Sequence, residues 1–447
     1  MTVSAIGPPR DALGLTGSSL CALREVRLPD DTVGDVLIGP DGVTAAPGSP
    51  LGPGVELNAR GWRVFPAPAE PHAHLDKALT APRLATSTES AGGAGIDTGN
   101  DLRAAIAQWH ALAPAIDAAD VHARALAAVR RYLAHGITAI RSHVNLSEGG
   151  DPFAALDALV ALREQLRGRV ILQVCLLPGS ADPDAVVAEA LTRGVDVLGG
   201  CPHLCPDPEK EIDRLLDLAE RHRLPVDLHC DEQLTTDLAD DQLDVVALAR
   251  QVLRRGLPGP VTASHAVRLG MLEPDRLAPV VELLARAGIG VVTLPITNLY
   301  LMGREATHAR PRGLTALRAL LDAGVTLAAG ADNLRDPFNP VGRADPFETT
   351  SLLMTAGQLT AAEALHAVTA GARAVLGLPE AGTAPGQVVD LVLVPDTDPG
   401  EVLAGGVTDR IVLHGGRVVA VSRTSSRVDL DLDQHAAERP APIEVSP

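Results

Sequence analysis

The sequence lacks the features by which membrane and exported proteins are recognised. No stretch approaches the ~18 consecutive apolar residues of a membrane-spanning helix, and residues 1–20 contain no basic start followed by an apolar run. The five cysteines are an odd and sparse set for 447 residues, which argues against a disulfide framework. We therefore expect a cytoplasmic protein that does not associate with membranes.

Positive charge is also scarce. The 38 basic residues face 56 acidic ones, for a net charge of −18, and only Lys77 and Lys210 among the basic residues are lysine. A surface so acidic disfavours phosphate backbones and anionic lipid headgroups, because each contact works against the protein's own field. Nucleic acid is therefore not an expected partner, and a neutral or cationic small molecule is favoured.

What the chain does contain is an ordered set of metal-binding side chains. His72 and His74 follow a Pro-punctuated apolar segment, and residues i and i+2 of an extended chain project to the same side. Two imidazoles so placed can bind one metal ion. Because fourteen histidines make a chance pair common, the order of the later residues carries the argument. Later apolar runs are followed in turn by His229 with Glu232, by His265 and by Asp332.

From residue 64 to about residue 330, strand-like and helix-like segments alternate, which indicates parallel βαβ units. Eight strand candidates predict a closed (β/α)8 TIM-like barrel of the α/β class, in which chemistry takes place at the C-terminal ends of the strands. Every candidate metal ligand lies at such an end or just beyond it. The expected strands are 64–67, 137–144, 170–176, 195–199, 225–228, 261–264, 290–294 and 325–330.

Both ends of the chain show a different, β-rich pattern. Short strand-like pieces with turns occupy 23–61, and a similar pattern returns over 382–394 and in a hairpin over 411–419. The simplest arrangement pairs the two ends in one small β-sandwich domain, formed by residues 1–63 and 378–447, beside a barrel domain of residues 64–377.

The four imidazoles and one carboxylate suit a divalent metal such as Zn²⁺ or Fe²⁺. A metal ion lowers the pKa of a bound water towards ~7 and so supplies hydroxide at neutral pH. Asp332 can touch the metal and also take the proton of the water. Glu232 lies three residues after His229, close enough to protonate a ring nitrogen and then the leaving amine. Hydrolytic deamination of an amidine-like carbon needs this division of labour.

The motifs resemble the amidohydrolase superfamily and, within it, the cytosine deaminase group. The similarity covers about residues 23–421, and the segment 332–336 also resembles triazine-pathway N-alkylammelide amidohydrolases. The matching motifs are Glu70 to Asp76, Arg141 to Val144, Cys201 to His203, Asp227 to Glu232, Thr262 to His265, Gly303-Arg304 with Arg312-Gly313, and Asp332 with Asp336-Pro337.

The resemblance implies a single metal held by His72, His74, His229 and Asp332. It also implies that His265 orients the water or the transition state and that Glu232 moves protons. The region of the fourth barrel strand carries no lysine that could be carboxylated to bridge two metals, which favours one ion. The resemblance further favours a homo-oligomer.

Departures from the family pattern fall in the expected substrate pocket. Gly179 stands where cytosine deaminases have a base-reading glutamine, Asn333 replaces a second aspartate, and Phe338 replaces a tryptophan. A hydrogen-bonding pocket rejects a substrate that lacks the matching groups, so cytosine is not the expected substrate. Leu177 and His203 complete the predicted substrate-binding set. His143 also lies near a strand end, where a pocket position and a packing role are equally open.

We therefore predict a metal-dependent hydrolytic deaminase of a small nitrogen heterocycle. Two alternatives use the same side chains: hydrolysis of a cyclic amide, and release of a substituted amine from a ring. A catalytically silent scaffold relative would require a degraded site, and all the ligand types and Glu232 are present.

Overall fold

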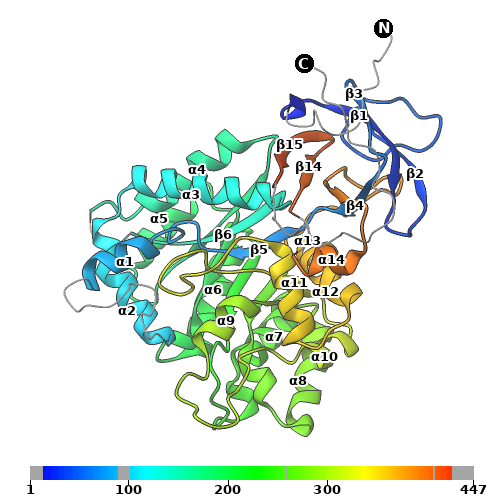
Figure 1. Ribbon diagram of the computed structural model, residues 1–447. Coiled ribbons are helices and arrows are strands. Elements are labelled where there is room, and N and C mark those ends of the chain that lie inside the picture. The colour runs from blue at the N-terminus through cyan, green and yellow to red at the C-terminus, as the bar shows by residue number, and fades with distance from the viewer. Residues whose placement is uncertain (1–13, 89–100, 148–149, 258, 406–407, 425–447) are drawn as a thin grey trace, which may run out of the picture.

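The computed structural model describes residues 14–88, 101–147, 150–257, 259–405 and 408–424. Its centre is an eight-stranded parallel sheet in which each strand pairs with its neighbour along the chain (Figure 1). A parallel bridge between Ala73 and Asp332 joins the first strand to the segment after the last, so that the barrel closes. The strands are β5 (Ala69–Ala73), β6 (Ala139–Asn145), β7 (Ile171–Leu177), β8 (Val197–Gly200), β9 (Val226–Cys230), β10 (Val261–His265), β11 (Gly290–Thr293) and β12 (Leu327–Ala329).

Helices surround the barrel, and local signals in the sequence set their ends. The Asp117 side chain accepts the backbone N–H of Asp120 at 2.8 Å and so caps the N-terminus of α3. Gly256, with a φ of 62°, ends α7 in the left-handed conformation that glycine adopts without steric cost. The helices are α1 (Ala81–Thr88), α2 (Leu102–Leu112), α3 (Ala118–Ala134), α4 (Ala154–Leu166), α5 (Asp184–Leu191), α6 (Pro208–His222), α7 (Asp244–Arg255), α8 (Pro274–Ala287), α9 (Pro295–Leu301), α10 (Leu317–Asp322), α11 (Pro346–Thr355), α12 (Ala361–Val368), α13 (Ala370–Val375) and α14 (Pro399–Leu403). Among the described residues, no helix combines the length and the apolar character needed to cross a membrane.

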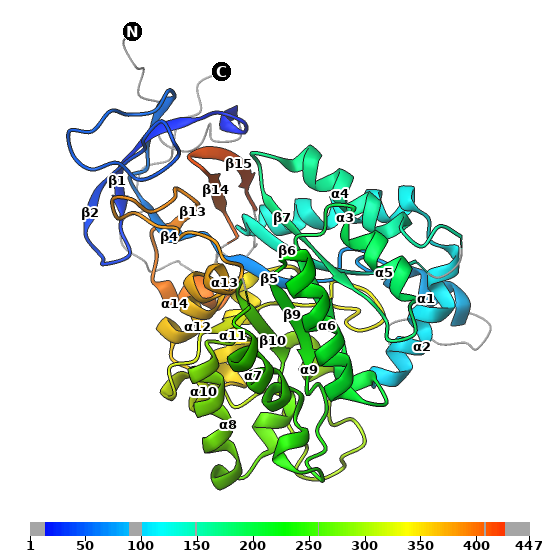
Figure 2. The same cartoon turned by 180° about the vertical axis from the view of Figure 1, so that it is seen from behind.

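The two chain ends meet in a second sheet, as predicted. Its strands form one hydrogen-bonded sheet of seven, in the order β15-β14-β13-β4-β1-β2 with β3 beside β1, and the sheet lies against one side of the barrel (Figures 1 and 2). One apolar cluster with members from both ends forms its core. The strands are β1 (Leu20–Arg27), β2 (Val33–Leu37), β3 (Val55–Asn58), β4 (Trp62–Pro66), β13 (Leu391–Pro395), β14 (Arg410–His414) and β15 (Arg417–Ser422).

The prediction of the first barrel strand is wrong. Residues 64–67 fall largely in β4, which pairs antiparallel with β13 in the small sheet, and the barrel begins at β5 instead. The run from residue 62 to 73 contains no turn glycine, and only Ala67 and Pro68 separate the two strands, so periodicity alone shows no boundary. As a result His72 lies within β5 and not after it. Strand β4 crosses the predicted domain limit at residue 63, and the limit at residue 378 stays a prediction.

A buried ion pair ties the small sheet to the barrel. Asp390, next to β13, accepts Arg373 Nη1 of α13 at 2.9 Å and the backbone N–H of Gly415 at 2.8 Å. His414 Nδ1 lies 2.9 Å from the same carboxylate. Both members of the Arg373–Asp390 pair are almost fully buried. Because both side chains are buried, removing either Arg373 or Asp390 would leave the charge of the other away from water.

Replacing Asp390 with asparagine is expected to lower the free energy of unfolding by about 3–5 kcal/mol, because the guanidinium of Arg373 would stay buried without its counter-charge. Denaturant unfolding of the metal-loaded protein measures the change. Asp322→Asn serves as the control, since its ion pair with Arg318 is exposed and is worth at most ~1 kcal/mol. Equal stability of the two variants would contradict the proposed role of the buried pair.

Candidate active site

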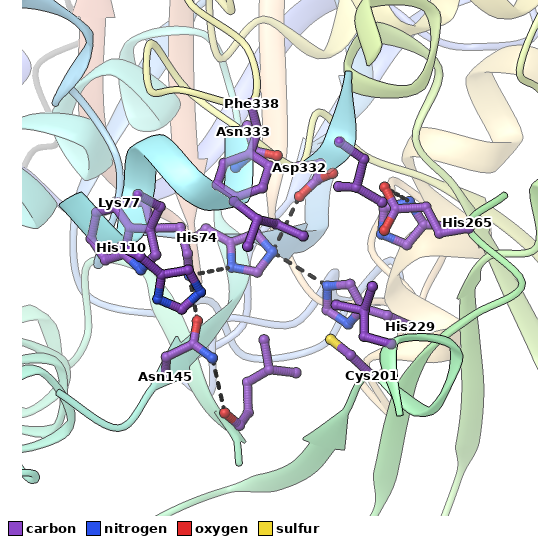
Figure 3. Close-up of a pocket in the computed structure, with 16 residues that line it drawn as sticks. His74, Lys77, His110, Asn145, Cys201, His229, His265, Asp332, Asn333 and Phe338 are labelled. Atoms are coloured by element: carbon purple, nitrogen blue, oxygen red, sulfur yellow. Dashed lines mark hydrogen bonds and ion pairs between the residues drawn. The ribbon is translucent and has the colours of Figure 1, made fainter. Parts of the chain in front are cut away.

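Five imidazoles gather at the C-terminal end of the barrel. Parallel strands end at the same rim, and this brings together residues up to 193 positions apart in the chain, since the set spans residues 72 to 265. The ring centres of neighbouring members lie between 3.9 and 5.5 Å apart. Figure 3 shows three of them, together with Asp332, turned toward a common point. The five are His72, His74, His143, His229 and His265.

The predicted ligand atoms have the spacing that one metal ion requires. His72 Nε2 lies 3.1 Å from His229 Nε2, which in turn lies 3.4 Å from His74 Nε2. Asp332 Oδ1 lies 3.3 Å from His74 Nε2 and 3.7 Å from His72 Nε2. Four ligands around a zinc ion at ~2.0–2.1 Å stand roughly 3.3 Å apart. The donor set therefore fits a divalent ion.

The electrostatics of the set agree with this geometry. Burial, more than any other cause, lowers the pKa of His72, His74 and His229 well below 6.5, so that these imidazoles are neutral and their lone pairs are available. Burial, followed by the nearby Glu232, raises the pKa of Asp332 well above its usual range. The buried Oδ1 of Asp332 has no hydrogen-bond partner among the described residues. A cation at this point would stabilise the carboxylate and occupy that oxygen.

A chain of hydrogen bonds fixes the tautomer of His72. Arg141 Nη1 donates to Asp227 at 2.8 Å, and Ser264 Oγ donates to the same carboxylate at 2.7 Å. Since its single proton is used there, Ser264 Oγ accepts from His72 Nδ1 at 2.9 Å. His72 therefore carries its proton on Nδ1 and presents the bare Nε2 to the site. All four residues are buried.

Removing the Ser264 hydroxyl, in Ser264→Ala, is expected to weaken metal binding by about 10–100-fold, because His72 loses the partner that orients its ring. Competition with a chromophoric chelator measures the affinity directly, without an activity assay. Ser49→Ala, at an exposed loop position, should keep the wild-type affinity. An unchanged affinity in Ser264→Ala would show that the chain does not position His72.

Glu232 lies beside the ligand set in a pocket that favours its protonated form. Its side chain is almost fully buried, and this burial raises its pKa to about 8. Oε1 lies 3.3 Å from His265 Nδ1, and Oε2 lies 3.6 Å from His203 Nε2. His265 is also held by Asn298, whose side-chain nitrogen is 3.1 Å from the same Nδ1. The site thus holds a carboxylic acid that can donate a proton near neutral pH.

His143 joins the cluster more closely than the sequence indicates. Its ring stacks on that of His72 with centres 3.9 Å apart, and His72, His74 and His143 each offer a nitrogen within 4.8 Å of the others. His72, His229 and His265 form a second such group. Burial lowers the pKa of His143 to about 4, so it is neutral as well. The structure therefore places His143 against the ligands and not in distant packing.

A cavity of about 160 Å³ opens onto these residues. Leu177, Asn333 and Phe338, which the sequence predicts as substrate-binding, line it together with His74, His229, Glu232, His265 and Asp332. His203 lies behind Glu232, where its Nδ1 donates to the backbone oxygen of His229 at 3.0 Å. Gly179 is not among the lining residues. Because β7 ends at Leu177, Gly179 falls in an exposed turn, where its N–H donates to Asp182 at 2.7 Å.

Several parts of the cavity are absent from the predicted set, among them helix α2 and Lys77. Helix α2 supplies Leu102, Ile106, Trp109 and His110, and nothing in the sequence shows that this helix lies over the rim. Lys77 lines the cavity as well, with its Nζ 2.7 Å from Asn145 Oδ1 and 3.3 Å from His74 Nδ1 (Figure 3). The same Nζ lies 3.0 Å from Asp76 Oδ2. A signal for Lys77 was available, since it is one of two lysines and follows the metal motif directly.

Comparisons with known proteins agree with this architecture. The sequence profile of the amidohydrolase family matches residues 85–420. A pterin deaminase from Rhizobium rhizogenes is 32% identical over 427 residues, which cover 93% of this chain and 92% of that protein. The structure of 5-methylcytosine deaminase from Klebsiella pneumoniae superposes with a TM-score of 0.79 at 24% identity, covering 91% of this chain and all of the other. N-isopropylammelide isopropylaminohydrolase from Burkholderia multivorans superposes with a TM-score of 0.72 at 28% identity, over 90% and 98% of the two chains.

Proposed function

This chain belongs to the amidohydrolase family, and from that premise we propose that it is a metal-dependent deaminase of a nitrogen heterocycle. The observation that carries the proposal is the convergence of three imidazole Nε2 atoms and Asp332 Oδ1 beside the protonatable Glu232. Hydrolysis of carbon–nitrogen bonds in cyclic compounds needs both groups on one face of the substrate.

His72, His74, His229 and Asp332 would hold one divalent ion, Zn²⁺ or Fe²⁺, which would supply Lewis acidity and acidify water. Asp332 then accepts the proton of the attacking water. Glu232 donates its proton to a ring nitrogen as the carbon becomes tetrahedral. The proton held by Asp332 then goes to the leaving amine, which departs as ammonia, and the new hydroxyl returns a proton to Glu232 as it becomes the carbonyl of the product. His265, held by Asn298, donates a hydrogen bond to the new oxygen through its other nitrogen.

For the substrate, we propose a fused aminopyrimidine ring of the pterin type. The 32% identity with a pterin deaminase extends over 93% of the chain and supports this class. The cavity has apolar walls, formed by Ile106 and by the aromatic rings of Trp109 and Phe338, that suit a planar ring. Asn145 and Asn333 also line the cavity, and each side-chain amide keeps a second N–H that could meet the carbonyl or ring nitrogens of the substrate.

Release of a substituted amine is the second candidate, because the solved N-isopropylammelide isopropylaminohydrolase shares 28% identity with nearly the whole chain. The bond that breaks is then the ring carbon–alkylamine bond, and the proton held by Asp332 goes to the leaving alkylamine. The ring stays closed in both reactions, so the leaving group tells them apart.

The test is ammonia release by the metal-loaded protein from pterin, 6-carboxypterin, cytosine, isocytosine, creatinine and amino-triazines, with mass spectra of the products. N-isopropylammelide is included to detect isopropylamine. Ammonia with a closed-ring product from a pterin supports the proposed substrate class. Release of isopropylamine alone would replace deamination by release of a substituted amine. A ring-opened product would replace it by hydrolysis of a cyclic amide. No product from any compound would reject the proposal.

A further inference from the structure

A second, larger cavity lies at the junction of the barrel and the small sheet. Its volume is about 930 Å³, and four arginines line it, which is unusual on a chain with a net charge of −18. The arginines come from separate elements: Arg131 from the last turn of α3, Arg335 and Arg343 from the loop after β12, and Arg410 from β14. None of them belongs to the catalytic cavity.

The floor of this cavity is a neutral ion pair. Arg410 is 2% exposed and forms a two-pronged contact with Asp345, at 3.0 and 2.9 Å. Its guanidinium stacks on the ring of Phe347, 4.7 Å from the centre. Its Nε is buried and has no hydrogen-bond partner among the described residues. His135 also lines the cavity, and its buried Nδ1 likewise has no hydrogen-bond partner among the described residues.

The walls carry excess positive charge. Arg343 pairs with Glu348, but its side chain remains 71% exposed. The guanidinium groups of Arg131 and Arg335 are exposed, and across the described part of the chain neither has an ion-pair or hydrogen-bond partner. Arginine forks match the paired oxygens of carboxylates and phosphates, and such charge-assisted contacts are among the strongest that a protein makes.

We propose that this cavity, which we call the arginine groove, binds a small multivalent oxyanion. Arg131, Arg335 and Arg343 would donate hydrogen bonds to the ligand and neutralise it at the walls, above the buried Arg410–Asp345 pair of the floor. Phosphate and carboxylate groups both have the required chemistry. The proposal of a binding site does not depend on the reaction assigned to the catalytic cavity.

The loop after β12 connects the arginine groove to the catalytic cavity. Asn333 and Phe338 of this loop line the catalytic cavity, whereas Arg335 and Arg343 line the groove. The carboxylate of Asp336 accepts hydrogen bonds from Asn333 Nδ2 at 2.9 Å and from the Phe338 N–H at 2.9 Å. A side chain at Gly342 would come within 2.5 Å of the Asn333 oxygen, so the two ends of the loop are in close contact. An anion held by the loop therefore biases the position of Phe338.

Coupling of this kind is reciprocal. If the anion changes the affinity of the protein for substrate by some factor, the substrate changes the affinity for the anion by the same factor. This consequence rests on the proposed function, because it requires a substrate in the catalytic cavity. Binding of the anion alone tests the groove separately.

The experiment is calorimetric titration of the full metal-loaded chain with inorganic pyrophosphate and, in a separate arm, with citrate, at constant ionic strength. We expect saturable binding of one anion per chain. Arg131→Ala and Arg335→Ala should each weaken it by about 10-fold, the effect of losing one charge-assisted contact of ~1.4 kcal/mol. Arg254→Ala is the matched control, since Arg254 is an exposed arginine in the last turn of α7.

Binding of pyrophosphate alone assigns the groove to phosphate-bearing ligands, and binding of citrate alone assigns it to polycarboxylates. The absence of saturable binding in both arms overturns the proposal. Equal weakening in Arg254→Ala overturns it too, because the binding would then be a general property of surface arginines. A change in KM on addition of the bound anion supports the coupling, and an unchanged KM with saturable binding retains the groove and rejects the coupling.

Discussion

His229→Ala is expected to lose its metal and all measurable turnover. His229 Nε2 stands between His72 Nε2 at 3.1 Å and His74 Nε2 at 3.4 Å, so it is the central member of the proposed ligand set. Loss of a partner that merely orients a ligand costs about 10–100-fold in metal affinity, and loss of a ligand itself should exceed that range. The metal content of the purified variant, measured by elemental analysis, should fall far below that of the wild type.

His308→Ala provides the control for this measurement, because His308 lies exposed in a loop outside the cavity. It should retain the metal and the activity. If His229→Ala kept a full complement of tightly bound metal, the ligand assignment would be wrong, and the group formed by His72, His74 and His143 would become the better candidate.

Glu232→Gln should separate metal binding from proton transfer. The amide has nearly the shape of the acid and keeps the contacts of Glu232 with His203 and His265 within reach, but it has no proton to give. We expect full metal content and a loss of about 10²–10⁴-fold in kcat, the usual contribution of a general acid or base. Steady-state kinetics on whichever substrate the panel identifies provides the measurement.

The pH dependence of kcat/KM provides a second test of Glu232 as the proton donor. Burial raises the pKa of Glu232 to about 8, so the acid is protonated at neutral pH and loses its proton as the pH rises through that value. The kcat/KM of the wild type should therefore decline on the alkaline side, and the glutamine variant should lack that decline. Glu282→Gln, at an exposed position of α8, should leave the profile unchanged. Wild-type turnover in Glu232→Gln would remove Glu232 from the mechanism.

The convergence of the proposed ligands could be predicted from the sequence because the barrel imposes a simple geometric rule. A residue at the C-terminal end of any strand reaches the same rim, so the order His72, His74, His229, His265 and Asp332 along the chain is enough to bring these residues together. Seven of the eight expected barrel strands overlap the observed ones for the same reason. Alternation of apolar strands and capped helices leaves few other folds for these segments.

The other features of the candidate site depend on tertiary contacts that no local sequence pattern encodes. Helix α2 places Trp109 over the cavity through tertiary packing, and its sequence is that of an ordinary amphipathic helix. The resemblance to the cytosine deaminases places Gly179 in the pocket, but in this structure the loop turns outward after Leu177. The relay through Ser264 joins residues that lie 192 positions apart in the sequence, from Ser264 to His72, and no spacing rule reveals it.

The short connection between β4 and β5 has a consequence for the biosynthesis of the protein. Strand β4 pairs with β13, whose residues Leu391–Pro395 leave the ribosome more than 300 residues after β4 itself. Only Ala67 and Pro68 separate β4 from the strand that carries His72. One edge of β4 can pair with β1 as soon as both strands have been made, whereas its other edge must wait for β13. Contacts so distant in sequence form late in folding, so we expect the strand that carries His72 to gain the full support of the small sheet only after β13 has been made.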